Sequence, residues 1–288
     1  FSVGTAANGG NLVATNLLSQ DFIELLRNRM VVAQMGARNL TGLVGNVAIP
    51  RQTGGAATFW VAENGTITEN SAVFDQIALT PKTVGAMNDI SRLLLKQSSI
   101  SVDSFVMMDL AKQMALAIDN AALNGSGANN QPKGILNTSG IGAVAIGATG
   151  GPATWSTIVD LETAVAAANA DVGSLGYVSN AKVRGALKKT QKGVNLPMIY
   201  EGGDLNGYQF GVTNQIHSDG TKSTGSNLSS LIFGNWDDLI IGQWGVLDML
   251  VDPYTGSNKG SVRIVAMQDV DIAVRHAASF AACTDISA

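Results

Sequence analysis

Residues 45–95 contain the strands of a long hairpin but lack the apolar side chains that would give it a core of its own. Short strand-forming runs stand at 58–62 (TFWVA), 73–79 (VFDQIAL) and 82–87 (KTVGAM), separated by Gly, Asn and Ser. An isolated two-stranded ribbon is only marginally stable in water. We therefore expect this hairpin to lie on a neighbouring surface, as part of an assembly.

The segment before the hairpin has the composition of an extended arm. Residues 1–20 are rich in Gly, Asn, Ala and Thr and show almost no periodicity, so we expect contact with another surface to order them. Residues 21–35 follow with the pattern of a short amphipathic helix, in which Phe22 and Leu26 lie apart from the basic Arg29. We expect this helix to attach the arm.

The strongest helical pattern runs from Ser101 to Asn124. Ser101 is a good N-cap, Asp103 favours the first turn through the helix dipole, and Asn124 with Gly125 ends the helix. At 1.5 Å per residue, about 23 residues make a rod of roughly 35 Å. Apolar residues recur at the spacing of three or four that is typical of a helix: Phe105, Met108, Ala111, Ala115 and Ile118.

A mixed α/β block is predicted after a glycine-rich connection. Thr154 caps an amphipathic helix, a strand at 176–178 follows, and a third helix begins near Asn180. Asn206-Gly207 is a tight-hairpin signal. The helix stripe is Ile158, Leu161, Val165 and Ala168, and later strand runs stand at 231–233, 239–241, 246–251, 262–267 and 270–274. The fold class is therefore α+β.

The chain carries too little charge for a protein covered by water on all sides. Charged residues make up 14% of it, against roughly 25% in typical soluble domains. Burial against other subunits accounts for this scarcity, so we expect a large homo-oligomer. No run of about 20 apolar residues predicts a membrane span. The net charge is -4 and only Lys188 and Lys189 are adjacent cations, so the electrostatic footprint of a nucleic-acid binder is missing.

Candidate metal-binding and catalytic acids are few. His217 and His276 are the only histidines, too few for a histidine-based metal site without carboxylates, and we expect ordinary polar or interface roles. Asp237 with Asp238 is one possible calcium or catalytic pair. Asp269 and Asp271 form the other such pair. For both pairs a turn or edge-strand charge is the favoured alternative, because strand acids discourage edge pairing.

Nucleophilic and nucleotide chemistry lack their usual sequence motifs. The sequence contains no GxSxG, Walker A or GxGxxG pattern. Cys283 is the only cysteine, which excludes an internal disulfide and a cysteine-rich metal site. The tryptophans are dispersed and are predicted to be core or interface anchors: Trp60, Trp155, Trp236 and Trp244. We therefore expect no enzyme activity, cofactor or metal.

The order of arm, hairpin, long helix, Gly-Pro turn, α/β block and returning strands resembles the Hong Kong 97-like capsid fold of tailed-bacteriophage major capsid proteins. Residues 119–136 (DNAALNGSGANNQPKGIL) are similar to the family's most recognisable segment, a helix end, a glycine-rich turn and a Pro-x-Gly-Ile-Leu exit. The similarity continues through 176–203, 205–216, 231–252 and 262–283 and so covers almost the whole chain.

This resemblance implies a division of the chain into five parts. They are an N-terminal arm (1–45), an extended hairpin loop (46–86), a peripheral domain with a spine helix (87–144), an axial domain (145–255) and returning peripheral strands (256–288). It also implies hexamers and pentamers that close around double-stranded DNA in a virion, without sequence-specific binding.

Further implications concern how the shell is made. Family members assemble in the cytoplasm of the bacterial host with a portal and a maturation protease, in some cases with a decoration protein. The protease removes an N-terminal segment, which would account for a chain that begins at Phe1, and we expect this to be the mature, processed form.

The covalent cross-link of the family's type member is not expected here. That cross-link joins a hairpin Lys to an Asn at the start of the penultimate strand, with a Glu nearby. In this chain the hairpin's only lysine is Lys82, near its base, the strand start reads Lys259-Gly260-Ser261, and 262–274 contains no Glu. We therefore predict no isopeptide bonds.

Two alternatives remain open from the sequence. An encapsulin-type nanocompartment uses a similar shell subunit to enclose a cargo enzyme. A secreted enzyme or adhesin would also suit a chain with low charge and many glycines.

Overall fold

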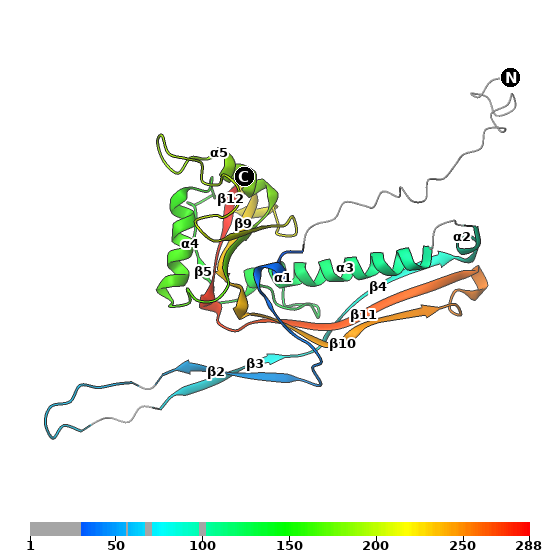
Figure 1. Ribbon diagram of the computed structural model, residues 1–288, viewed down its shortest axis with the longest axis horizontal. Coiled ribbons are helices and arrows are strands. Elements are labelled where there is room, and N and C mark those ends of the chain that lie inside the picture. The colour runs from blue at the N-terminus through cyan, green and yellow to red at the C-terminus, as the bar shows by residue number, and fades with distance from the viewer. Residues whose placement is uncertain (1–29, 56, 67–70, 98–101) are drawn as a thin grey trace.

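The computed structural model describes residues 30–55, 57–66, 71–97 and 102–288. Its described strands form a two-stranded, a four-stranded and a six-stranded sheet. Figure 1 shows the six-stranded sheet with its helices as one block, the four-stranded sheet and α3 extending from it, and the hairpin projecting away. The predicted arm, residues 1–20, and most of the helix predicted at 21–35 lie outside the described residues. The described remainder of that helix is the single turn α1 (Val32–Met35).

The hairpin consists of β2 (Val47–Gly54) and β3 (Val73–Leu79), which pair antiparallel from Val47 opposite Leu79. Its strands end earlier than predicted, because Pro81 has no N–H to donate and the chain then changes sheet. The run predicted at 82–87 begins β4 (Lys82–Ser91), which pairs with β11 (Ser261–Val274). The strand predicted at 58–62 is wrong, since these residues form an exposed coil.

The four-stranded sheet has the order β1-β10-β11-β4. The short β1 (Arg38–Leu40) runs parallel to β10 (Leu239–Asp252), and the other pairs are antiparallel. Strand β10 contains the two runs predicted at 239–241 and 246–251, and β11 contains those predicted at 262–267 and 270–274. The small helix α2 (Arg92–Gln97) follows β4, and a turn of 3-10 helix, η6 (Ser257–Lys259), precedes β11.

The long helix α3 (Val102–Asn124) confirms the predicted rod, and Gly125 N–H caps its end on the carbonyl of Ala121. The predicted cap Ser101 lies outside the described residues. Of the recurring apolar residues, Phe105 and Ile118 are partly buried against apolar clusters, whereas Met108 is half exposed. The buried residues that pack on the sheet are Val106, Leu110 and Met114. Apolar residues occur on most sides of this helix, so their spacing does not select a face.

The six-stranded sheet has the order β5-β12-β9-β6-β7, with β8 beside β9. The strands are β5 (Gly142–Ala143), β6 (Leu175–Ser179), β7 (Gln209–Val212), β8 (Gly220–Lys222), β9 (Gly225–Asn235) and β12 (Phe280–Ser287). Helices α4 (Trp155–Ala167) and α5 (Ala181–Lys189) accompany it. Single 3-10 turns are η4 (Ile135–Asn137), η5 (Trp236–Asp238) and η7 (Ala277–Ser279).

Local signals of this block are confirmed. Thr154 caps α4 in a capping box with Thr157, and the side chain of Asn180 caps α5. Asn206 and Gly207 take positive φ angles of 54° and 79° in a tight turn. In the predicted stripe of α4, Ile158, Leu161 and Val165 are buried, but Ala168 is the exposed C-cap.

Sheet membership does not change at the predicted boundary between 255 and 256. β10, placed by the resemblance in the 145–255 range, belongs to the four-stranded sheet, and β12, in the 256–288 range, belongs to the six-stranded sheet. The two sheets are therefore joined by three chain crossings, from β4 through α3 to β5, from β9 to β10 and from β11 to β12. A buried cluster at their junction combines the end of α3 with residues of both sheets, including Ile232 of β9, Ile241 of β10 and Ile272 of β11.

Candidate assembly surfaces

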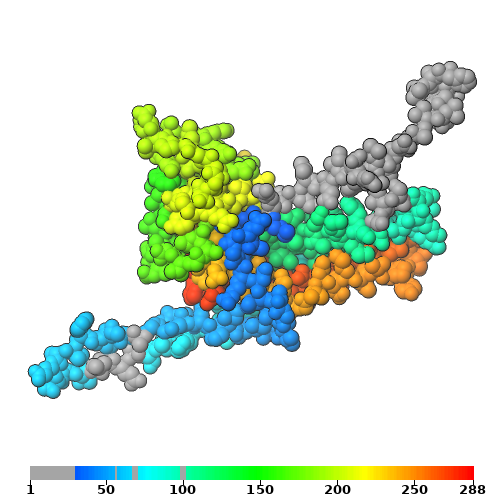
Figure 2. All heavy atoms as spheres, in the orientation of Figure 1, coloured from blue at the N-terminus to red at the C-terminus, as the bar shows by residue number. Residues whose placement is uncertain are grey.

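The hairpin exposes large apolar side chains along its strands and the described part of its tip. They are Phe59, Trp60, Val61, Val73 and Phe74. Trp60 has a relative exposure of 105%, that of a side chain in an open chain. Figure 2 shows the hairpin standing clear of the body. Large apolar side chains that are exposed on one projecting segment make it a candidate interaction site.

Among the described residues of the hairpin, only those at its base pack against the body. Leu79 is fully buried in a small cluster with Ile240 and Trp244, and Val47 and Ile49 pack against that cluster. The hairpin strands therefore gain stabilising burial at one end, while the described residues of the distal part form no core.

A buried carboxylate fixes the chain where it passes from β3 to β4. Asp271 Oδ2 accepts the backbone N–H of Thr80 at 2.9 Å, and its Oδ1 lies 2.6 Å from Lys82 Nζ. Asp271 is 3% exposed. Because an unpaired buried charge is costly, this aspartate depends on both partners and orients the hairpin base.

Arg51 makes the second polar contact at the base. One guanidinium nitrogen donates to the carbonyl of Arg275 at 3.0 Å, and the other lies 2.9 Å from Asp75 Oδ2. The hydrogen bond from Arg51 holds the pKa of Asp75 below its usual value. The first contact joins the hairpin to the end of β11, so Arg51 also sets the direction in which the hairpin leaves.

The face of the four-stranded sheet opposite α3 carries an exposed apolar row. Leu250, Val265 and Met87 stand directly opposite one another on β10, β11 and β4. Leu250 is 55% exposed and Met87 67%. Beside the row, Arg263 forms a bidentate pair with Asp89 at 2.7 and 3.0 Å. This face is a second candidate contact surface.

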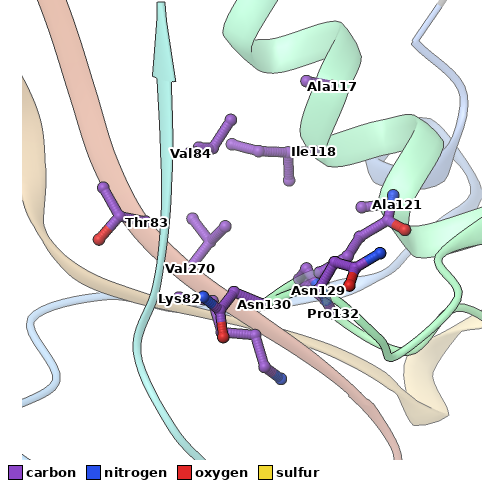
Figure 3. A pocket seen from close by; sticks show the side chains of 11 residues that line it. Lys82, Thr83, Val84, Ala117, Ile118, Ala121, Asn129, Asn130, Pro132 and Val270 are labelled. Atoms are coloured by element: carbon purple, nitrogen blue, oxygen red, sulfur yellow. The ribbon is translucent and has the colours of Figure 1, made fainter.

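A half-open pocket of about 240 Å³ lies between the end of α3, the start of β4 and the loop 129–132. Val84, Ile118 and Val270 face one another across it, as Figure 3 shows. Asn129 and Asn130 at its rim have left-handed backbones, with φ of 52° and 60°. Lys82 is the one titratable lining residue, and its amine is paired with Asp271. The pocket is a depression with apolar walls and an amide-rich rim.

The histidines lie in separate local networks. His217 Nε2 is 3.0 Å from Ser230 Oγ, and its Nδ1 is buried without a partner. His276 Nδ1 is 3.3 Å from Asp238 Oδ2. Within the described ranges, no three His, Cys, Asp or Glu side chains gather as a metal site.

The favoured interpretation of the aspartate pairs needs correction. Asp269 and Asp271 lie on β11, a central strand rather than an edge strand. Asp238 is in a turn as predicted but is 8% exposed and accepts the hydroxyl of Ser279 at 2.5 Å. Asp237 is the exposed member of its pair. Asp238 and Asp271 thus belong to buried polar networks, which the alternation of residues along a strand does not reveal.

Cys283 lies in the core of the six-stranded sheet, and burial raises the pKa of its thiol to about 12. Its Sγ donates to Asp285, whose other oxygen lies 2.5 Å from Lys222 Nζ. Of the tryptophans, Trp236 and Trp244 are buried, whereas Trp60 is exposed. None of the described helices is long and apolar enough to cross a membrane.

The model of the phage capsid family matches residues 9–285. The chain belongs to the phage capsid family. This membership confirms the resemblance found in the sequence to a family of structural, non-enzymatic capsid proteins.

Two relatives are named major capsid protein. That of Halomonas phage phiHAP-1 is 32% identical over 277 residues, which are 96% of this chain and 44% of the relative. That of Klebsiella oxytoca phage phiKO2 is 32% identical over 135 residues, 47% of this chain and 32% of the relative. The chain therefore spans less than half the length of the capsid proteins it matches.

Solved capsids share the fold over the whole chain. A subunit from the capsid of a native GTA particle matches with a TM-score of 0.82 and 22% identity, covering 100% of this chain and 99% of the other. A chain from Gordonia phage Cozz matches with a TM-score of 0.73 and 15% identity, covering 98% and 94%. The predicted Hong Kong 97-like capsid fold is confirmed at this level.

Proposed function

We propose that this chain is the tiling subunit of an icosahedral phage capsid, forming hexamers and pentamers that enclose double-stranded DNA. The observation that carries the proposal is the hairpin, which is anchored at its base by Asp271 and leaves Trp60 and Phe74 in water. Such a hairpin becomes stable when its apolar side chains are buried on another copy.

The exposed row of Leu250, Val265 and Met87 offers a place for such a contact. It is apolar, lies on a rigid sheet and is flanked by a satisfied ion pair, as the core and rim of an interface are. Shell subunits held by many modest contacts of this kind assemble without covalent bonds.

The five-part division remains part of the proposal. The arm (1–45) and extended loop (46–86) would make contacts between copies, the peripheral parts (87–144 and 256–288) would carry the spine helix, and 145–255 would face the capsomer axis. Strand β10 of the range 145–255 belongs to the four-stranded sheet, and β12 of the range 256–288 belongs to the six-stranded sheet. We therefore define the peripheral and axial parts by the sheet to which each strand belongs rather than by residue range.

The remaining partners follow from the family. A portal, a maturation protease and a possible decoration protein would meet this subunit during assembly in the bacterial cytoplasm. The net charge of -4 favours a shell that encloses DNA without gripping it, because a weakly acidic wall lets packaged DNA slide. Strong, salt-sensitive binding of DNA to the assembled subunit would contradict this.

A hairpin variant tests the proposal. Phe59, Trp60 and Phe74 are replaced together by Ser, and sedimentation velocity under assembly conditions compares this variant with the parent chain. We expect the parent to form large closed particles and the variant to remain in small oligomers with unchanged circular dichroism. Assembly of the variant at the parent's rate would reject the hairpin as the carrier of the contact.

A further inference from the structure

The segment Val31–Gly36 is held by a carboxylate that lies far away in the sequence. Asp119 of α3 accepts the N–H of Val32 at 2.9 Å and that of Val31 at 3.3 Å. Asp119 is 5% exposed. The helix α1 has no side-chain cap of its own, so Asp119 supplies the acceptor that its first N–H groups need.

The apolar side of the same segment lies against glycines of the six-stranded sheet. A Cβ on Gly176 of β6 would overlap the end of Met35, and a Cβ on Gly211 of β7 would overlap Val31. Val31 and Met35 are each 3% exposed. The two glycines therefore form a socket that has room for these side chains because no Cβ fills it.

The segment thus touches both parts of the subunit at their junction. It is bonded to the end of α3 through Asp119 and buried against β6 and β7 through Val31 and Met35. We propose that Val31–Gly36 is a detachable latch, with Asp119 as its catch and Gly176 and Gly211 as its socket, which holds the long helix against the six-stranded sheet.

Several features favour opening of this latch before the rest of the junction. A helix of four residues is not stable alone, so its order depends on the catch and the socket. The flanking Met30 is 46% exposed, and β1 beyond it has only three residues. Burial of the Asp119 carboxylate also costs free energy, because loss of hydration disfavours the charged form and raises the pKa of this group. Such segments open before the surrounding core does.

Hydrogen exchange of the full chain tests the latch in the subunit itself, independently of shell formation. One variant removes the polar contact of the latch and the other disturbs its apolar contact. Asp119→Ala removes the acceptor of two buried N–H groups, and Gly211→Ala fills the socket while leaving Asp119 in place. The matched controls are Gln113→Ala, exposed on α3, and Gly185→Ala on α5, where an added Cβ meets nothing within 4 Å.

We expect both variants to speed exchange of the amides from Val32 to Ala37 roughly tenfold or more, while the amides of β9 stay protected. Both controls should leave the latch unchanged. If either variant leaves the exchange of this segment at the parent rate, the proposal is wrong. Loss of protection in β9 together with the segment would also overturn it, because the segment would then be an inseparable part of the core.

Discussion

Lys82 Nζ lies 2.6 Å from Asp271 Oδ1, an ion pair between the first residue of β4 and the central strand β11. The same carboxylate accepts the N–H of Thr80, so one buried group fixes the chain at the point where the hairpin joins the body. Control of the hairpin's direction is therefore concentrated in a few named side chains, each of which can be tested.

Replacing Asp271 with Ala should lower the free energy of unfolding by about 1–3 kcal/mol, because a buried N–H and a partly buried ammonium lose their acceptor. Urea denaturation measures this loss. The control is Asp269→Asn on the same strand, whose partner Thr83 lies at the surface, and we expect it to cost less than about 1 kcal/mol. Equal losses of stability for the two substitutions would contradict the claim that the buried contacts of Asp271 stabilise the fold.

Replacing Trp60 with Ser should leave the stability of the subunit within about 0.5 kcal/mol of the parent, because its side chain touches little in the single chain. Assembly should nevertheless be slower and weaker. Trp236→Ala is the contrasting change, since this tryptophan is fully buried and its loss costs about 3–5 kcal/mol. Light scattering and denaturation together separate the two roles, and a destabilised but normally assembling Trp60 variant would contradict the account.

The thiol of Cys283 should be inert in the folded chain. Its pKa of about 12 keeps it protonated at pH 8, and the surrounding core excludes reagents. Because the folded pKa lies above the ordinary value of 9.0, its contribution to stability is complete below pH 9 and declines as the pH rises toward 12. A maleimide reagent should label one thiol only after denaturation. Rapid labelling of native protein would refute this burial.

Assembled particles should contain no isopeptide cross-links. The amine of Lys82 is held by Asp271 of its own chain, and the strand start after Lys259 offers no asparagine. A boiled, reducing gel of particles should show one band at the subunit mass of 29.8 kDa. A ladder of multimers would disprove the prediction.

Local signals in the sequence predicted the elements well. The caps Thr154 and Asn180 and the turn at Asn206-Gly207 lie where their side-chain chemistry requires them, because these signals act over a few residues. The long helix was found for the same reason. The spacing of apolar residues did not single out its buried face, since Met108 and Val106 are equally apolar and only the position of the sheet decides between them.

Long-range pairings could not be predicted in the same way. The run from Lys82 has a strand pattern that suits a hairpin or a sheet, and its partner β11 lies far along the chain. In the sequence Asp271 has the pattern of an edge-strand charge, because its partners Lys82 and Thr80 lie about 190 residues away and become neighbours only in the fold. Asp119 was not singled out either, because a lone acid in a helix gives no sign that it binds the backbone of a segment 87 residues away.

Negative-stain electron microscopy of the purified chain tests the central claim most directly, which is that this subunit tiles a closed shell. We expect uniform polyhedral particles, in which subunits meet through the hairpin and the exposed sheet face. A discrete small oligomer under every assembly condition would contradict the account.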